Sequence, residues 1–271
     1  MHTMMSRNHI KLVRTQVRPD VAAGLDPRSP YLSRLSARSA LYTDLQLLLD
    51  DRSEALSSCD YRQVVLQENC LARASDSARR KLWKELKNRY ILDRERPLFR
   101  LFWHEWRRCS SEMERGLTAY VLLALNDRLV ADLGLNWLYG FLRKSPADLR
   151  VDDVCKFIDH SAAVDHPEVR KWTEDTRLHV AQHYLASIRD FGLATGKFRK
   201  TTVRPALYGP PMRLLIHALR MAAVRDLEIV GSPVFGLLGL DRSEVIEALG
   251  ELNRQGELRF RMQADVVEMS L

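Results

Sequence analysis

Residues 73–108 read RASDSARRKLWKELKNRYILDRERPLFRLFWHEWRR, and this stretch is the most informative part of the chain. It holds twelve Lys or Arg and five acids, so its surplus of seven positive charges equals the net charge of the whole 271-residue sequence. Residues 1–38 add seven basic residues against Asp20 and Asp26, which leaves the rest of the chain slightly acidic. Positive charge this localised indicates a surface that faces a polyanion, most commonly nucleic acid.

The same stretch predicts the second helix of a helix-turn-helix. Tyr61–Leu71 forms the first helix, and Ser75 or Asp76 offers an N-cap for a helix that runs to about Tyr90. On a helical wheel one face of this helix is apolar and the opposite face is basic. The apolar face comprises Ala78, Leu82, Trp83, Leu86 and Tyr90, and the basic face comprises Arg80, Lys81, Lys84 and Lys87.

A basic helix face can bind phosphates, or it can simply be solvated. The lack of interleaved acids favours nucleic-acid contact, since Glu85 is the single acid beside the basic face. Arg79 is a further contact candidate, although it falls on the apolar side of the wheel. Its long side chain must therefore reach out to solvent, or the helical register differs.

The rest of the chain predicts a mainly α protein with a flexible basic arm and three further regions. A helix with Leu41, Leu45, Leu48 and Leu49 on one face precedes the helix-turn-helix, and large aromatic residues at helical spacing indicate a central bundle. The expected divisions are an arm at 1–32, a helix-turn-helix domain at 33–96, a central helical bundle at 97–170 and a C-terminal winged-helix region at 171–271.

A second candidate contact lies at the start of the C-terminal region. The helix expected over Glu174–Phe191 has a buried stripe of Leu178, Ala181, Leu185 and Ile188, and neutral hydrogen-bonding groups lie opposite. These groups, which could touch base edges or phosphates, are Thr176, His179, Gln182, His183 and Ser187. The small hairpin expected beyond this helix suits a wing on the sugar-phosphate backbone, because it carries only basic charges: Lys197, Arg199, Lys200 and Arg204.

The last part of the chain has the element order of a winged helix. After a helix that ends near Arg225, we expect a short strand at Leu227–Val230 and a helix starting at Ser232-Pro233. A capping box at Asp241–Glu244 then precedes another helix, followed by a strand from Leu258 to Met262 and a hairpin at Gln263–Asp265. The presumed recognition helix exposes Glu244, Glu247 and Glu251, so this module is expected to pack internally or to contact protein.

Signals for catalysis, cofactors and membranes are missing. His179 and His183 have zinc-ligand spacing, but Val180 stands where metalloproteases carry Glu and no third ligand is near, so no metal is expected. Phosphate-cradling, dinucleotide-binding and nucleophile-elbow motifs are absent, which argues against an enzyme, a cofactor or a small-molecule substrate. The sequence has no apolar run near the length of a membrane span, no secretory signal and four scattered cysteines. These features indicate a cytoplasmic protein with reduced core thiols.

Two blocks carry a resemblance to a known family. Tyr61–Leu92 combines a short helix, a Ser-rich turn and a basic helix that ends in R-Y, and His166–Leu207 carries H-P-E-V-x-x-W, T-R before a helix, a G-L strand and a closing Pro. Together they resemble the BrxA family, small components of BREX bacteriophage-exclusion systems, over roughly residues 33–225. Where relatives tend to have basic residues after W-x-x-x-T-R, this chain has His179, Gln182 and His183.

The resemblance implies a mostly helical, non-catalytic, DNA-binding accessory protein with helix-turn-helix character and a NusB-like central bundle. It also implies a place beside a methyltransferase and other defence proteins in the bacterial cytoplasm. We therefore expect binding to double-stranded DNA, mainly through phosphates. Two alternatives stay open at this point: an interaction scaffold whose basic face meets an acidic protein, and a helix-turn-helix transcriptional regulator.

Overall fold

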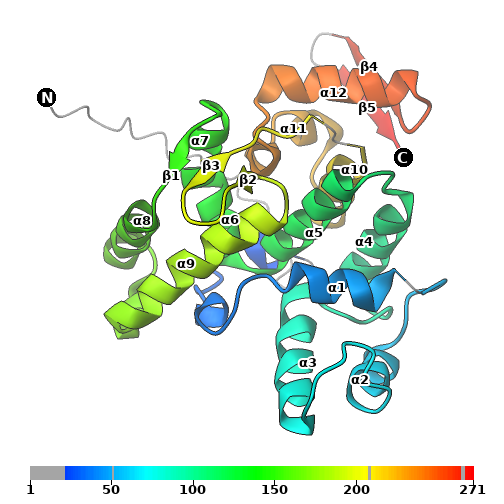
Figure 1. The fold of residues 1–271 in the computed structure, drawn as a ribbon. Helices are drawn as coiled ribbons and strands as arrows, with labels where there is room; N and C mark the ends of the chain where they lie inside the picture. The colour runs from blue at the N-terminus through cyan, green and yellow to red at the C-terminus, as the bar shows by residue number, and fades with distance from the viewer. Residues whose placement is uncertain (1–21, 51, 207–208, 264–265) are drawn as a thin grey trace, which may run out of the picture.

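The helix α5 (Glu112–Asn126), buried over most of its length, lies at the centre of the fold (Figure 1). The structure is a computed structural model that describes residues 22–50, 52–206, 209–263 and 266–271. Every residue from Leu117 to Leu125 is buried, and a helix that is apolar all round must be covered on all sides. The covering helices are α3 (Asp76–Tyr90), α4 (Pro97–Arg108) and α10 (Gly209–Met221).

The N-terminal segment is more ordered than the sequence predicts. Residues 22–32 were expected in a loosely ordered arm, but Ala22, Leu25 and Tyr31 are buried. The short helix η1 (Ala23–Leu25) passes so close to α5 that a Cβ on Gly24 would lie 1.8 Å from the Ala124 carbonyl oxygen. That part of the arm prediction is wrong, because its apolar residues join the core. Residues 1–21 lie outside the described residues.

The helices that follow are mostly where the sequence places them. They are η2 (Ser33–Ser36), α1 (Tyr42–Leu49) and α2 (Ser58–Leu66), then α3 and α4. Beyond α5 the chain continues through α6 (Arg128–Asp132), η3 (Leu133–Leu138), α7 (Tyr139–Leu142), α8 (Val151–Val164), η4 (Pro167–Lys171) and α9 (Glu174–Asp190). The helix α9 packs against α8 on one side and η2 on the other, so it ties the N-terminal segment to the centre of the molecule.

A small antiparallel sheet follows α9. The expected hairpin is present as β2 (Ala194–Thr195) and β3 (Lys200–Thr202), with Ala194 opposite Thr202. A third strand, β1 (Asp148–Leu149), pairs with the other edge of β3, so the strand order is β1-β3-β2. The strand β1 was not predicted, because two residues are too few for an alternating strand pattern.

The C-terminal elements are α11 (Asp226–Val230), η5 (Pro233–Leu238), α12 (Arg242–Arg254), β4 (Arg259–Gln263) and β5 (Val266–Ser270). The predicted strand at Leu227–Val230 is wrong. These residues are helical, and the Glu228 carboxylate caps the first turn by accepting hydrogen bonds from the Arg225 amide at 3.3 Å and from its guanidinium at 2.7 Å. The expected capping box at Asp241 and Glu244 and the final hairpin are confirmed. Residues 264 and 265 of the turn lie outside the described residues.

The fold is mainly helical with small antiparallel sheets, as predicted. Figure 1 shows the pair α2 and α3 at one end of the molecule and α12 with β4 and β5 at the opposite end. One hydrophobic core extends from Ala22 to Met269, and the division at residues 33, 97 and 171 stays a prediction. Among the cysteines Cys109 is buried whereas Cys59 and Cys70 are exposed, so the expectation of core thiols fails for the latter two. Within the described ranges no helix is both long and apolar enough to cross a membrane.

Candidate nucleic-acid interface

The basic helix α3 has a capped start and a clear end. The Ser75 hydroxyl accepts a hydrogen bond from the Ala78 amide at 3.2 Å, and Ile91 ends the helix in the left-handed region with φ of 54°. Leu82, Leu86 and Tyr90 are buried against the core, as predicted. The inner face of α3 is thus fixed by burial, which determines the direction in which its outer face points.

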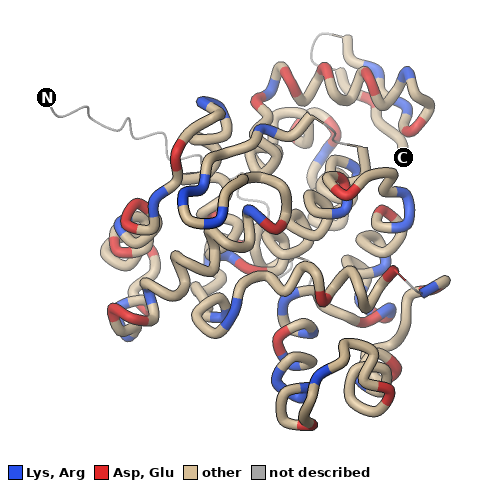
Figure 2. The backbone as a smooth tube through the Cα atoms, viewed as in Figure 1, with Lys and Arg blue, Asp and Glu red and all other residues tan. Residues whose placement is uncertain are grey.

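Four exposed cations occupy the outer face of α3, and we call Arg80, Lys81, Lys84 and Lys87 the α3 stripe. Figure 2 shows basic residues along this helix. Arg80 pairs with Asp76 at the helix start, and its hydrogen bond lowers the pKa of the Asp76 carboxyl. Within the described part of the chain, Lys81 and Lys84 have no ion pair. The Lys87 Nζ atom lies 5.9 Å from the centroid of the Trp83 ring.

The acid beside the stripe is used elsewhere. The Glu85 carboxylate forms an ion pair with Arg89, which is fully buried on the inner side of α3. Arg89 also donates hydrogen bonds to the carbonyl oxygens of Arg34 at 2.9 Å and Arg38 at 3.0 Å. Glu85 therefore balances a buried charge and does not neutralise the lysines of the stripe.

Arg79 lies between the two faces of α3. Its side chain is half-buried, and its Nη2 atom is 3.5 Å from the Asp76 carboxylate. Asp76 thus holds two arginines at the first turn, where a negative charge is also favourable for the helix dipole. The sequence assigns five basic residues to this surface. Arg79 and Arg80 form ion pairs with Asp76, whereas Lys81, Lys84 and Lys87 do not.

The helix α9 presents fewer polar groups outward than its sequence predicts. Ser187 is buried, and its hydroxyl accepts a hydrogen bond from the Ala40 amide at 2.8 Å, so placing it on the outer face was wrong. Leu178 is exposed rather than part of the buried stripe. The His183 Nδ1 atom lies 2.6 Å from the Leu35 carbonyl oxygen, because η2 packs on this face of α9. Contacts from a segment distant in sequence therefore engage Ser187 and His183.

Two other residues of α9 that the sequence predicts to contact nucleic acid, Thr176 and His179, lie near the start of the helix. Thr173 caps the helix by accepting a hydrogen bond from the Thr176 amide at 3.1 Å, and the two threonine hydroxyls are 2.9 Å apart. His179 is exposed, and its ring centroid lies 6.2 Å from that of His183. No group of three or more possible metal ligands occurs in the described ranges, and the metal-free state stays a prediction.

The β2–β3 hairpin brings Lys197, Arg199 and Lys200 together at its tip. Lys197 and Arg199 are exposed, whereas burial and the nearby Arg189 lower the pKa of the half-buried Lys200. Arg204, which the sequence places on the same basic wing, points away from it. Its guanidinium pairs with Glu244 of α12 and donates to the Gly239 carbonyl oxygen at 3.3 Å. The basic group of the hairpin is therefore confined to the tip.

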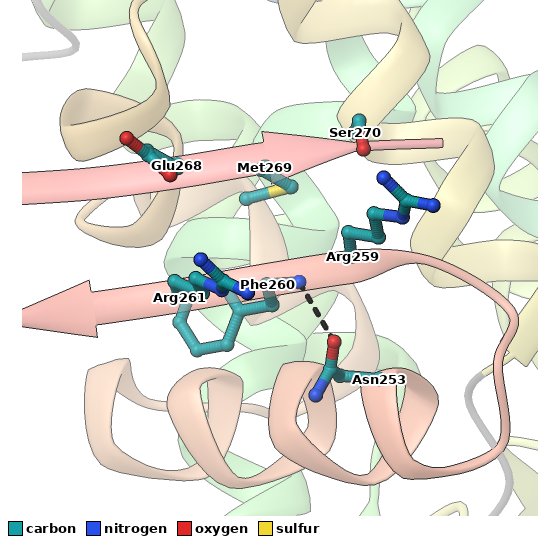
Figure 3. A pocket seen from close by; sticks show the side chains of 7 residues that line it. All are labelled: Asn253, Arg259, Phe260, Arg261, Glu268, Met269 and Ser270. Atoms are coloured by element: carbon teal, nitrogen blue, oxygen red, sulfur yellow. Dashed lines mark hydrogen bonds between the residues drawn. The ribbon is translucent and has the colours of Figure 1, made fainter.

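The C-terminal wing is close to electrically balanced. Glu244 is not an exposed acid, as the sequence suggested, because Arg143 and Arg204 both pair with it; Glu251 pairs with Arg254. A hollow of about 570 Å³ lies between Asn253 of α12 and the hairpin β4–β5. Figure 3 shows the side chains that line it. Arg261 stands opposite Glu268 across the two strands of this hollow, so its charge has a neighbour of opposite sign.

The H-P-E-V block at residues 166–169 has a structural role that its sequence does not reveal. His166 is buried and stacks on Tyr31 with ring centroids 3.5 Å apart, and Glu168 accepts a hydrogen bond from the Tyr31 amide at 2.6 Å. The Tyr31 hydroxyl donates to Asp132, which also binds Arg128. These contacts anchor the segment before η2 to the central helices.

Comparison with known proteins identifies the family. The family model for BrxA matches residues 29–219, well over half of the chain, so the chain belongs to the BrxA family. Membership implies a component of a BREX phage-defence system, and the family is generally considered non-catalytic. The resemblance stated from sequence is confirmed.

A solved structure shares the fold. The crystal structure of an uncharacterized protein from Magnetospirillum magneticum matches with a TM-score of 0.55 and 15% sequence identity. The match covers 71% of this chain and 95% of that chain, and at this identity it speaks for the fold alone. No curated protein matches the chain.

Proposed function

We propose that this chain is a non-catalytic accessory protein of a BREX system that binds double-stranded DNA through phosphate contacts of the α3 stripe. The observation that carries the proposal is the set of exposed lysines at Lys81, Lys84 and Lys87, whose one adjacent acid, Glu85, is held by the buried Arg89. Unneutralised, clustered lysines on a helix that is anchored from its other side are a good phosphate-binding surface.

The geometry of the stripe suits a groove. At 100° per residue, the four cations span an arc of about 120° around α3. An arc this wide lets one helix meet phosphates on both walls of a major groove, as the second helix of a helix-turn-helix does. We therefore propose that α2 and α3 form the helix-turn-helix, with α3 as the helix that enters the groove. We also propose that α12, β4 and β5 form a winged helix and that the central bundle is NusB-like.

A duplex partner fits these features better than the alternatives. The one apolar side chain next to the stripe is Trp83, and it is buried on the inner face of α3. Because stable protein interfaces have an apolar core, the stripe is a poor surface for binding a folded protein. Protein partners, such as the methyltransferase of the same system, are assigned to other surfaces, with the balanced C-terminal wing as the first choice. We propose no small-molecule substrate or cofactor.

The test is the salt dependence of binding to duplex DNA. Each phosphate neutralised contributes about 0.9 to the slope of log affinity against log salt concentration. The variant Lys84→Ala with Lys87→Ala should therefore weaken binding to unrelated duplexes equally and make the slope shallower by up to about 1.8. A folded double variant with unchanged affinity and slope would remove α3 from the contact surface.

A further inference from the structure

The tip of the β2–β3 hairpin exposes an aromatic ring. Phe198 is 91% exposed, the most exposed large hydrophobic side chain in the described part of the chain. Single apolar residues at a surface are common, but tight turns favour Gly, Asn, Asp and Ser, so Phe is unusual at this place. The ring is therefore available for contact with a partner.

The turn that carries Phe198 is well defined by its backbone. Gly196 has φ of 90°, and a Cβ there would lie 1.9 Å from the Arg199 carbonyl oxygen, so the turn closes tightly across these residues. The Lys200 ammonium group donates to the Lys197 carbonyl oxygen at 3.3 Å. Behind the turn, β3 pairs with β2 on one edge and β1 on the other. Phe198 is thus presented on a supported projection.

The charges around the ring are all positive on this hairpin. The Lys197 Nζ atom lies 5.7 Å from the ring centroid, and Arg199 follows directly. No acid occurs in residues 191–207 of the sequence. Two acids beside the hairpin are engaged: Asp190, whose charge reaches Lys200, pairs with Arg189, and Asp148 accepts a hydrogen bond from the Thr201 hydroxyl at 3.2 Å on the β1 side. A flat ring between cations is complementary to a partner that combines planar aromatic groups with negative charge, which describes nucleic acid.

We infer that Phe198 is a wedge that stacks into a base step of bound duplex DNA while Lys197 and Arg199 hold the flanking phosphates. Apolar side chains that enter a duplex from the minor groove unstack one base step and bend the helix axis. This inference rests on the proposed binding of duplex DNA and adds a second contact to it. In this arrangement the α3 stripe attracts the DNA through its phosphates, and the hairpin tip distorts the DNA locally.

The experiment compares Phe198→Ala with the wild-type chain on duplexes that contain 2-aminopurine, a base whose fluorescence rises when it is unstacked. The variant should bind about tenfold more weakly, since stacking on an aromatic side chain is lost. Its salt slope should stay unchanged, because no phosphate contact is removed. The wild type should raise the fluorescence of the duplex, Phe198→Ala should not, and Phe198→Trp should restore both the affinity and the rise.

Controls separate this inference from the proposed function. Because Phe198 is almost fully exposed, the variant should keep the melting transition of the wild type. If the wild type binds duplex DNA with a steep salt slope and Phe198→Ala binds and unstacks equally well, the wedge is overturned and the proposed function stands. If the wild type fails to bind duplex DNA, both are overturned. Loss of capture of a defence protein without any change on DNA would assign the tip to a protein partner and also overturn the wedge.

Discussion

Reversing the charges of Lys81 and Lys84 to Glu should abolish the retardation of duplex DNA in a gel-shift assay. Both side chains are exposed and free of ion pairs within the described residues, so the change leaves the packing of α3 intact. Two new carboxylates would face phosphates, and like charges brought together in this way oppose binding by several kcal/mol. We expect affinity to fall by about 100-fold or more, which corresponds to roughly 3 kcal/mol.

Arg80 is a poorer choice for this test than Lys81. Its pairing with Asp76 means that reversal would also place two acids together at the first turn of α3 and disturb the helix itself. A matched control reverses two exposed lysines elsewhere, Lys144 and Lys171, with the same change in net charge. Equal losses for the control and the α3 variant would mean that net charge alone drives binding, against a specific role for the stripe.

The C-terminal wing provides the second comparison for the same assay. Arg259→Ala with Arg261→Ala should barely change DNA retardation, because this hairpin carries little unbalanced charge. Each variant must first show a wild-type circular dichroism spectrum and melting transition. Loss of binding in the wing variant together with retention in the α3 variant would place the DNA contact at the opposite end of the molecule.

Replacing Arg213 by Met should destabilise the fold by about 3–5 kcal/mol. Arg213 is buried in α10, and its Nε atom donates to the buried Glu105 of α4 at 2.7 Å, with Glu257 as a second partner. Burial lowers the pKa of the Arg213 guanidinium, and the charge and hydrogen bond of Glu105 oppose that shift. Without Arg213, the Glu105 carboxylate is left buried beside α10 with no strong cationic partner. Chemical denaturation monitored by circular dichroism measures the loss.

A double variant distinguishes pairing from simple packing. With Arg213→Met, a second change of Glu105→Leu removes both charges and leaves apolar groups of similar length. Buried ion pairs replaced in this way are often neutral in their effect on stability. The double variant should therefore regain most of the free energy of unfolding. If it is as unstable as the sum of its single variants, the two residues are uncoupled and the ion pair is not what joins α4 to α10.

Local signals were enough to predict the helices that matter for the proposed interface. Ser75 and Asp241 begin their helices as caps, and the spacing of Leu82, Leu86 and Tyr90 sets the inner face of α3. Such features depend on neighbours within one or two turns, so they can be read from the chain directly. The same holds for the β2–β3 hairpin.

The errors lie where distant segments meet. Ser187 looks like a surface group on a helical wheel, yet it is covered because Ala40 supplies a donor from 147 residues away. Glu244 and Arg204 were assigned to separate surfaces, although they pair with each other. None of these contacts leaves a periodic signal in the sequence.

The candidate site also has one part that the sequence predicts and one part that it does not. The exposure of Lys81, Lys84 and Lys87 follows from the helical period and could be predicted. The pairing of Glu85 with Arg89, which leaves the stripe without a neutralising acid, could not be predicted. It depends on Arg89 being buried against the carbonyl oxygens of Arg34 and Arg38. Phe198 was passed over, since a single aromatic residue in a basic hairpin has no spacing pattern to mark it.

Chemical footprinting of lysines on the bound complex tests the central claim most directly. The protein is treated with an amine-reactive reagent with and without a saturating duplex, and the modification rate of each lysine is measured by mass spectrometry. We expect Lys81, Lys84 and Lys87 to be strongly protected by DNA, and Lys144 and Lys171 to react at the same rate in both samples. Unprotected α3 lysines in a sample that demonstrably holds bound duplex would contradict the account.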